Sequence, residues 1–279
     1  MDKCIDSVPF TIIGLNKAIL KKVNVELAQI FKNFNNFIAK VIDSNKGQNS
    51  QENSIVQLLL DPKNHFSNQE IYEELILTTM ASFATSTKTL AATLVLLAMH
   101  KDKQQKLFDE IDEIYSTESD TKFSNDFLQK FIYLDAVLKE SMRIFPAIPI
   151  IGREASEEVE IEGYLIPKGT VILISIFAMH RDKKIWGDDA DAFKPERFFE
   201  ELTNPHAFVP FAGGKRICIG YRYAMVSMKI FLINFLRKYK VDCLTKFEEI
   251  ETEMTLTLNF VNGFNVSIEK RGNEKNFIC

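Results

Sequence analysis

The stretch FVPFAGGKRICIGYRYA, residues 208–224, decides how the rest of the chain is interpreted. Its glycines Gly213, Gly214 and Gly220 can adopt backbone conformations closed to other residues, so the main chain can fold closely around a ligand. Apolar residues then recur at helical spacing over residues 221–239, which predicts that Cys218 lies just ahead of a helix N-terminus. The partial positive charge of that terminus favours an ionised sulfur. The stretch is therefore suited to presenting one thiolate.

An isolated Cys is most often an inert buried thiol. The residues around Cys218, however, form the pattern Phe211-x-x-Gly214-x-Arg216-x-Cys218-x-Gly220. This pattern resembles that of the cytochromes P-450, the haem-thiolate monooxygenases. The resemblance implies that Cys218 is the axial ligand of a haem b iron, that Arg216 contacts a haem propionate, and that Phe211 packs beside the sulfur. It also implies a mainly α fold with small β-sheets, of which this chain is the C-terminal portion.

Composition limits the remaining possibilities. With 279 residues, 46% of them hydrophobic and 23 of them Phe, the chain can bury the core of one large domain or two small ones. A net charge of −4 predicts no nucleic-acid partner. Cys4, Cys218, Cys243 and Cys279 are far apart, which excludes a C-x-x-C zinc or redox site and fits a reducing, cytosol-facing compartment.

We expect no signal peptide or membrane anchor in this chain. The first residues are a mixed polar and apolar run, and the longest apolar stretch, residues 71–99, is interrupted by Glu73, Glu74 and Lys88.

The first half of the chain is predicted to be helical. Residues 17–42 place apolar side chains on one broad face, and residues 55–60 form a short turn before Pro62. Ser67 and Glu70 form a capping box, which predicts a long helix from there to about Met99. Two more amphipathic helices are expected at residues 103–115 and 130–145.

The middle of the long helix reads ASFATST, residues 81–87. The resemblance assigns it to the helix that crosses the distal face of the haem, where a Thr and a preceding acid relay protons to bound dioxygen. Thr85 and Ser86 match the family pattern, and Thr85 is assigned the catalytic role. Ser82 stands where Gly is usual and Ala84 where the acid is usual, which leaves open a peroxide-using enzyme that needs no proton delivery. A small polar residue bonding back to its own helix is the alternative for Thr85.

Ala81 stands where the related branch often has a Glu that esterifies the haem, so no covalent attachment is expected there.

Three charged residues form a second family signature. Glu140 and Arg143 share a helix face, which by itself is usually a solvated ion pair. Some fifty residues later the segment KPERFF contains Arg197. The resemblance implies that Glu140, Arg143 and Arg197 form a buried network behind the haem.

The region between these signatures is predicted to be a β-hairpin, with strands at residues 159–161 and 171–176. The resemblance implies that Arg153 meets a propionate and that a preceding segment lines the substrate pocket near the haem: Ala147, Ile148, Pro149, Ile150 and Ile151. Ordinary core packing is the alternative for those apolar residues. A closing hairpin is predicted from residues 254–258 and 264–268.

The resemblance extends over about residues 60–270 and is strongest to the microsomal branch that includes fatty-acid ω-hydroxylases. It implies a monooxygenase that hydroxylates a small apolar molecule such as a fatty acid, a steroid or a xenobiotic. The electrons would come from an NADPH-dependent reductase or cytochrome b5, docking on a basic face formed by Lys215, Arg216, Arg222 and Lys229. A solvated basic face is the alternative.

Full-length relatives are expected on the cytosolic face of the endoplasmic reticulum membrane. Compared with them, this chain is expected to lack the front half and the membrane anchor. A haem-thiolate isomerase and a truncated non-catalytic chain are the remaining alternatives.

Overall fold

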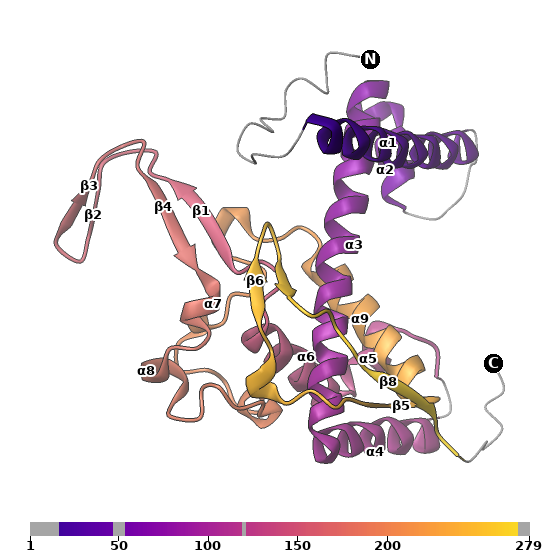
Figure 1. The fold of residues 1–279 in the computed structure, drawn as a ribbon, viewed down its shortest axis with the longest axis vertical. Helices are drawn as coiled ribbons and strands as arrows, with labels where there is room; N and C mark the ends of the chain where they lie inside the picture. The colour runs from indigo at the N-terminus through magenta and orange to yellow at the C-terminus, as the bar shows by residue number, and fades with distance from the viewer. Residues whose placement is uncertain (1–16, 47–53, 119–120, 273–279) are drawn as a thin grey trace. The chain divides into compact units, whose positions relative to one another are not determined.

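The computed structural model describes residues 17–46, 54–118 and 121–272 (Figure 1). Cys4 and Cys279 lie outside these ranges. The chain divides into two compact units, Met1–Ala81 and Ser82–Cys279. The described residues are mainly helical with four small two-stranded sheets, which confirms the predicted fold class.

The first unit contains helices α1 (Lys17–Asn45) and α2 (Ile55–Leu60), the short 3-10 helix η2 (Pro62–Asn64) and the start of α3 (Asn68–Met99). Its small core consists of Ile38, Leu59, Ile71 and Leu75. The predicted apolar face of α1 is covered only in part, because Ile30 and Phe37 are exposed.

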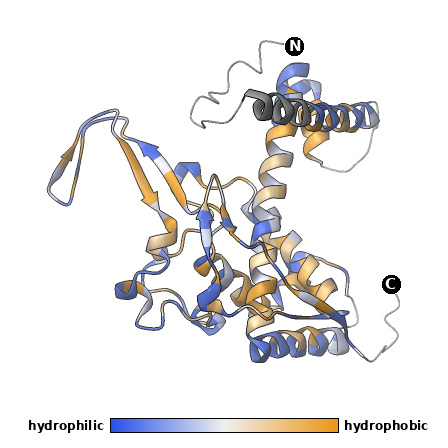
Figure 2. Cartoon of the chain, in the orientation of Figure 1, coloured by the Kyte–Doolittle hydropathy of each residue, from blue (hydrophilic) through white to orange (hydrophobic). Residues whose placement is uncertain are grey.

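The long helix α3 begins where the capping box predicts. The Ser67 Oγ accepts from the Glu70 N–H at 3.2 Å, and the Glu70 carboxylate accepts from the Ser67 N–H at 2.8 Å. Among the described residues, α3 is the one helix with the length and composition to cross a membrane, although these two properties alone are weak evidence (Figure 2). Glu73, Glu74 and Lys88 interrupt this helix as noted, and the expected absence of a membrane anchor stays a prediction.

In the second unit, three helices pack around the C-terminal part of α3. They are α4 (Lys101–Thr117), α6 (Ile132–Ile144) and α9 (Tyr221–Leu236), with the short α5 (Asn125–Gln129) beside them. Their shared core is almost fully buried and includes Leu96, Leu97, Leu107, Ile111, Phe131, Leu134, Leu138, Leu232 and Ile233. Shorter elements connect the rest: α7 (Ile176–Met179), α8 (Lys183–Trp186), η3 (Pro195–Phe198), η4 (Pro205–Ala207), η5 (Gly214–Arg216) and η6 (Phe247–Glu249).

The first predicted hairpin is wrong in its pairing. Strand β2 (Val159–Ile161) pairs with β3 (Tyr164–Ile166), and β4 (Val171–Ser175) pairs with the earlier strand β1 (Ile150–Glu154). The β2–β3 hairpin is thus inserted at the end of the β1–β4 ribbon (Figure 1). Glu162 and Gly163, both at positive φ, make the tight turn that the longer predicted hairpin missed.

The closing hairpin is also paired differently from the prediction. Strand β6 (Thr252–Met254) pairs with β7 (Leu258–Phe260), while β8 (Ser267–Lys270) pairs with β5 (Tyr239–Asp242), which directly follows α9. Short alternating runs identify strands but carry little information on their partners.

One carboxylate of α4 bonds to the start of α6 in addition to their shared apolar core. Helix α6 has no side-chain cap of its own. Instead, the Glu110 carboxylate accepts from the Tyr133 N–H at 2.5 Å and the Leu134 N–H at 2.9 Å. Burial raises the pKa of Glu110, against the lowering effect of these hydrogen bonds. A residue of α4 therefore supplies the N-terminal cap of α6.

We predict that Glu110→Ala lowers the free energy of unfolding by about 1 to 3 kcal/mol, because two N–H groups lose their partner. Urea unfolding followed by circular dichroism measures this. Glu113→Ala is the control, because Glu113 is exposed on the same helix. Equal losses in the two variants would contradict the capping role.

Candidate functional site

Cys218 lies on a loop held at its two ends. The loop leaves η4, turns through η5 and enters α9 at Tyr221, with Gly220 as the N-terminal cap residue. The Cys218 N–H donates to the Phe211 carbonyl at 2.9 Å, which closes the loop on itself. The thiol is free and exposed. The predicted position just ahead of a helix is therefore observed.

Of the three glycines, only Gly214 needs the conformational freedom of glycine. Its φ is +69°, whereas Gly213 is extended and Gly220 has a φ of −86°. Ala212 adopts a φ of +61°, an uncommon conformation for a residue with a side chain. A Cβ atom at Gly220 would lie 3.9 Å from the Cys218 Sγ, an ordinary contact.

His180 holds the start of this loop, although its sequence pattern did not mark it as part of the site. The Nε2 atom of His180 accepts from the Val209 N–H at 3.0 Å, and its ring stacks on Phe208 at a centroid distance of 5.3 Å. His180 is fully buried, and burial lowers its pKa to about 4. The imidazole is therefore neutral and acts as an acceptor. Its position in HRD, the sequence that begins the approach to KPERFF, is the one signal for it.

We predict that His180 makes stability fall between pH 6.5 and about 4, because the unfolded chain takes up a proton there and the folded chain does not. Between pH 7 and pH 5 this amounts to about 2 kcal/mol. In His180→Gln, which does not titrate, the free energy of unfolding should fall by that much less. Urea unfolding at the two pH values measures the difference, and parallel pH dependence in the two proteins would refute it.

The structure brings together the three charged residues assigned to the buried network. Arg143 and Glu140 are both fully buried, with the Arg143 Nε 2.7 Å from the Glu140 Oε2 and Nη2 2.9 Å from Oε1. The Arg197 Nε approaches the same carboxylate at 3.3 Å. The solvated ion pair considered for Glu140 and Arg143 is therefore excluded.

Backbone carbonyls accept hydrogen bonds from the remaining N–H groups of the Arg143 guanidinium. Nη1 donates to His180 at 2.8 Å and to Ala190 at 2.6 Å, and Nη2 donates to Ala192 at 3.1 Å. The network thereby fixes the residue that holds the Cys218 loop. On its outer side, Arg197 pairs with the exposed Asp189 and lowers the pKa of that carboxyl to about 2.

We predict that Glu140→Ala lowers the free energy of unfolding by about 3 to 5 kcal/mol, because it leaves Arg143 as an uncompensated buried charge. Soluble yield and the thermal unfolding midpoint report this loss. Glu160→Ala, at an exposed position on β2, is the matched control and should change neither quantity. An unchanged midpoint in Glu140→Ala would show that the network is not needed for folding.

The segment assigned to the substrate pocket is held between two elements. The Ala147 carbonyl accepts from the Leu258 N–H at 3.0 Å, and the Pro149 carbonyl accepts from the Phe177 N–H at 3.1 Å. Ile148 is half-buried, and Ile150 and Ile151 begin strand β1. Arg153, farther along β1, donates to the neighbouring Gly152 carbonyl at 2.8 Å.

Thr85 is half-buried on α3, in the same turn as Ala84. Back-bonding of the kind considered for Thr85 occurs along this helix at Thr89 and Thr93. Their hydroxyls donate to the carbonyls of Thr85 and Thr89 at 3.1 and 2.8 Å. The aliphatic side chain at Ala84 provides no acid at that turn.

Comparison with known proteins decides the family. The cytochrome P-450 family model matches residues 5–263. The chain belongs to the cytochrome P-450 family. The match begins well before residue 60, where the resemblance in the sequence becomes recognisable.

Related cytochromes P-450 come from insects and mammals. The chain is 34% identical to probable cytochrome P-450 313a4 of Drosophila melanogaster over 80% of its own length and 47% of that protein. It is 34% identical to cytochrome P-450 3A13 of Mus musculus over 77% of its length and 43% of that protein, and 34% identical to cytochrome P-450 4V2 of Pongo abelii over 76% and 40%. The chain thus spans about half the length of the curated relatives it matches.

The predicted basic face of this P-450 chain is smaller than expected. Lys215, Arg216 and Arg222 are exposed near the Cys218 loop. Lys229 does not belong with them, because it is mostly covered and pairs with Asp135 of α6 at 2.6 Å.

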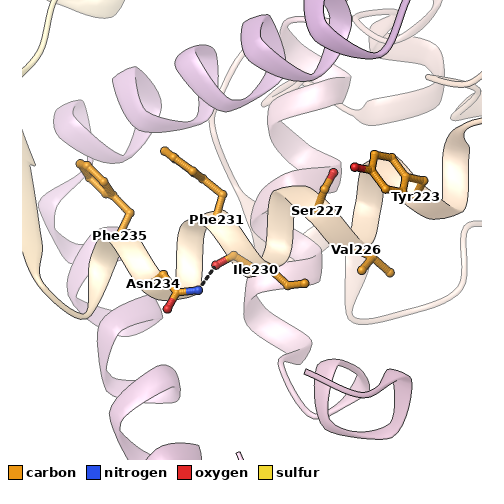
Figure 3. A pocket seen from close by; sticks show the side chains of 7 residues that line it. All are labelled: Tyr223, Val226, Ser227, Ile230, Phe231, Asn234 and Phe235. Carbon is orange, nitrogen blue, oxygen red and sulfur yellow. Dashed lines mark hydrogen bonds between the residues drawn. The ribbon is translucent and has the colours of Figure 1, made fainter. Parts of the chain in front are cut away.

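A shallow apolar pocket runs along one face of α9 (Figure 3). It is lined by Tyr223, Val226, Ser227, Ile230, Phe231, Asn234 and Phe235. Neither Cys218 nor the segment 147–151 lines it, and its one titratable side chain is Tyr223. The pocket therefore does not coincide with the predicted substrate site.

Proposed function

We propose that this chain is a haem-thiolate monooxygenase unit, with Cys218 as the ligand of the haem iron. The observation that carries the proposal is the exposed Cys218 thiol on a loop held by the Phe211 carbonyl and His180. Membership of the cytochrome P-450 family supports the same role.

The residues present fit a haem group. Cys218 offers a soft sulfur donor, and the neighbouring Ile217 and Ile219 are 50% and 101% exposed, which suits an apolar ring system. The exposed Arg216 and the half-buried Arg153 would bind the propionates, while Phe211, Gly214 and Gly220 would shape the loop that carries Cys218. When bound, the haem supplies one-electron and dioxygen chemistry.

In this proposal the protein's own residues position the substrate and handle protons. Residues Ala147 to Ile151 orient a small apolar substrate. The hydroxyl of Thr85, on α3, serves as the proton donor. NADPH-dependent reductase or cytochrome b5 would dock on the exposed basic residues Lys215, Arg216 and Arg222. The working location is the cytosolic face of the endoplasmic reticulum membrane.

A specific observation favours a second candidate function. Ala84 removes the acid that normally accompanies the Thr in the proton relay. An enzyme that rearranges or consumes a peroxide needs no such relay, so a haem-thiolate isomerase or peroxide-using enzyme is the alternative. Oxygen and NADPH consumption in the presence of reductase separates the two, because only the monooxygenase consumes both.

We predict that Cys218→Ser abolishes stable haem binding while Cys243→Ser leaves it intact. Cys243 is the matched control because it is the other free cysteine among the described residues and lies after β5. Haem titration followed by absorbance and gel filtration measures the loss. Equal haem retention in the two variants would contradict the assignment of Cys218 as the ligand. Failure of the parent chain to bind haem would favour a non-catalytic chain.

A further inference from the structure

The side chain of Lys88 is an unexplained positive charge on α3. It is half-buried, and its Nζ donates to the Thr257 Oγ1 and to the Asn259 Oδ1. Both acceptors are neutral. Within the part of the chain that the structure describes, Lys88 forms no ion pair with a carboxylate.

The oxygens that hold Lys88 are themselves positioned by the β6–β7 turn. The Asn259 Nδ2 donates to the Thr255 Oγ1 at 3.1 Å, which directs the Asn259 Oδ1 away from the turn and toward Lys88. Thr257 is nearly buried, with 7% of its surface exposed. The side chains of Thr257 and Asn259 therefore hold the ammonium group in one place.

Lys88 lies close in the chain to the predicted catalytic Thr85, and its partners lie next to a contact of the segment predicted to line the substrate pocket. Lys88 follows Thr85 by three residues, so the two share a face of α3. Between Thr257 and Asn259 lies Leu258, whose N–H donates to the carbonyl of Ala147 at 3.0 Å. Ala147 is the first residue of the segment assigned to substrate.

The charge and the hydrogen-bond donors of the Lys88 ammonium indicate what kind of ligand it binds. An ammonium has three N–H donors, of which two are engaged, and a half-buried charge without a counter-ion is unfavourable. A carboxylate would take the third donor and neutralise the charge. Leu256 of the β6–β7 turn and Met254 at the end of β6 are 85% and 56% exposed, so the surroundings suit an apolar body attached to that carboxylate.

We propose that Lys88 is a binding residue for the carboxylate of an apolar acid. That this acid is the substrate rests on the proposed monooxygenase function, whereas the binding itself does not. Thr257 and Asn259 act as positioning residues, because they fix the ammonium and leave its charge unpaired.

Calorimetric titration of the full chain with dodecanoate and with dodecan-1-ol tests the proposal. The two probes share an alkyl chain and differ in charge. We expect the parent chain to prefer dodecanoate, and Lys88→Met to weaken dodecanoate binding by about tenfold or more, the worth of one charge-assisted hydrogen bond. Dodecan-1-ol binding should not change. Lys88→Arg should retain most of the preference.

Lys168→Met is the matched control, because Lys168 is an exposed lysine between β3 and β4. Equal affinity for the two probes, an equal loss of both in Lys88→Met, or no binding of either would overturn the proposal. Circular dichroism shows whether each variant is folded. If Lys88→Met is unfolded, the preference of Lys88→Arg for dodecanoate over dodecan-1-ol decides the proposal. The dodecanoate preference should persist in Cys218→Ser, so a failure of haem ligation and a failure at Lys88 give different results.

Discussion

The buried ion pair between Glu140 and Arg143 is the interaction on which the arrangement around Cys218 depends. Two fully buried charges are tolerable only if every hydrogen-bonding position is used. Arg143 meets this condition by donating to three backbone carbonyls as well as to Glu140. The chain segments that provide those carbonyls, at His180, Ala190 and Ala192, are thereby fixed relative to α6.

Fixing these segments has a direct effect on the site. His180 supplies a carbonyl to Arg143 and a ring nitrogen to the backbone of Val209, where the Cys218 loop begins. His180 thus links the buried ion pair to the loop that carries the exposed thiol. The N-terminus of α9 holds the other end of the loop. A positive φ at Ala212, a residue with a side chain, is costly to adopt, and such a frame offsets that cost.

The sequence predicts the parts of this structure whose signals are local or densely patterned. The capping box at Ser67 and Glu70 marks the start of α3, and the spacing around Cys218 predicts both the loop and the following helix. Strand pairing is not predicted, because the short runs at residues 159–161 and 267–270 fit several partners equally well. The roles of His180 and Lys88 also escape sequence reasoning, since each depends on groups distant in the chain.

We propose that Cys218 is the thiolate ligand of a haem iron. The carbon monoxide difference spectrum of the reduced, haem-reconstituted chain tests it most directly, because the position of the main absorption band reports the ligand opposite carbon monoxide. We expect the red-shifted band of thiolate ligation. A band at the position typical of haem ligated by a neutral nitrogen or oxygen donor would contradict it.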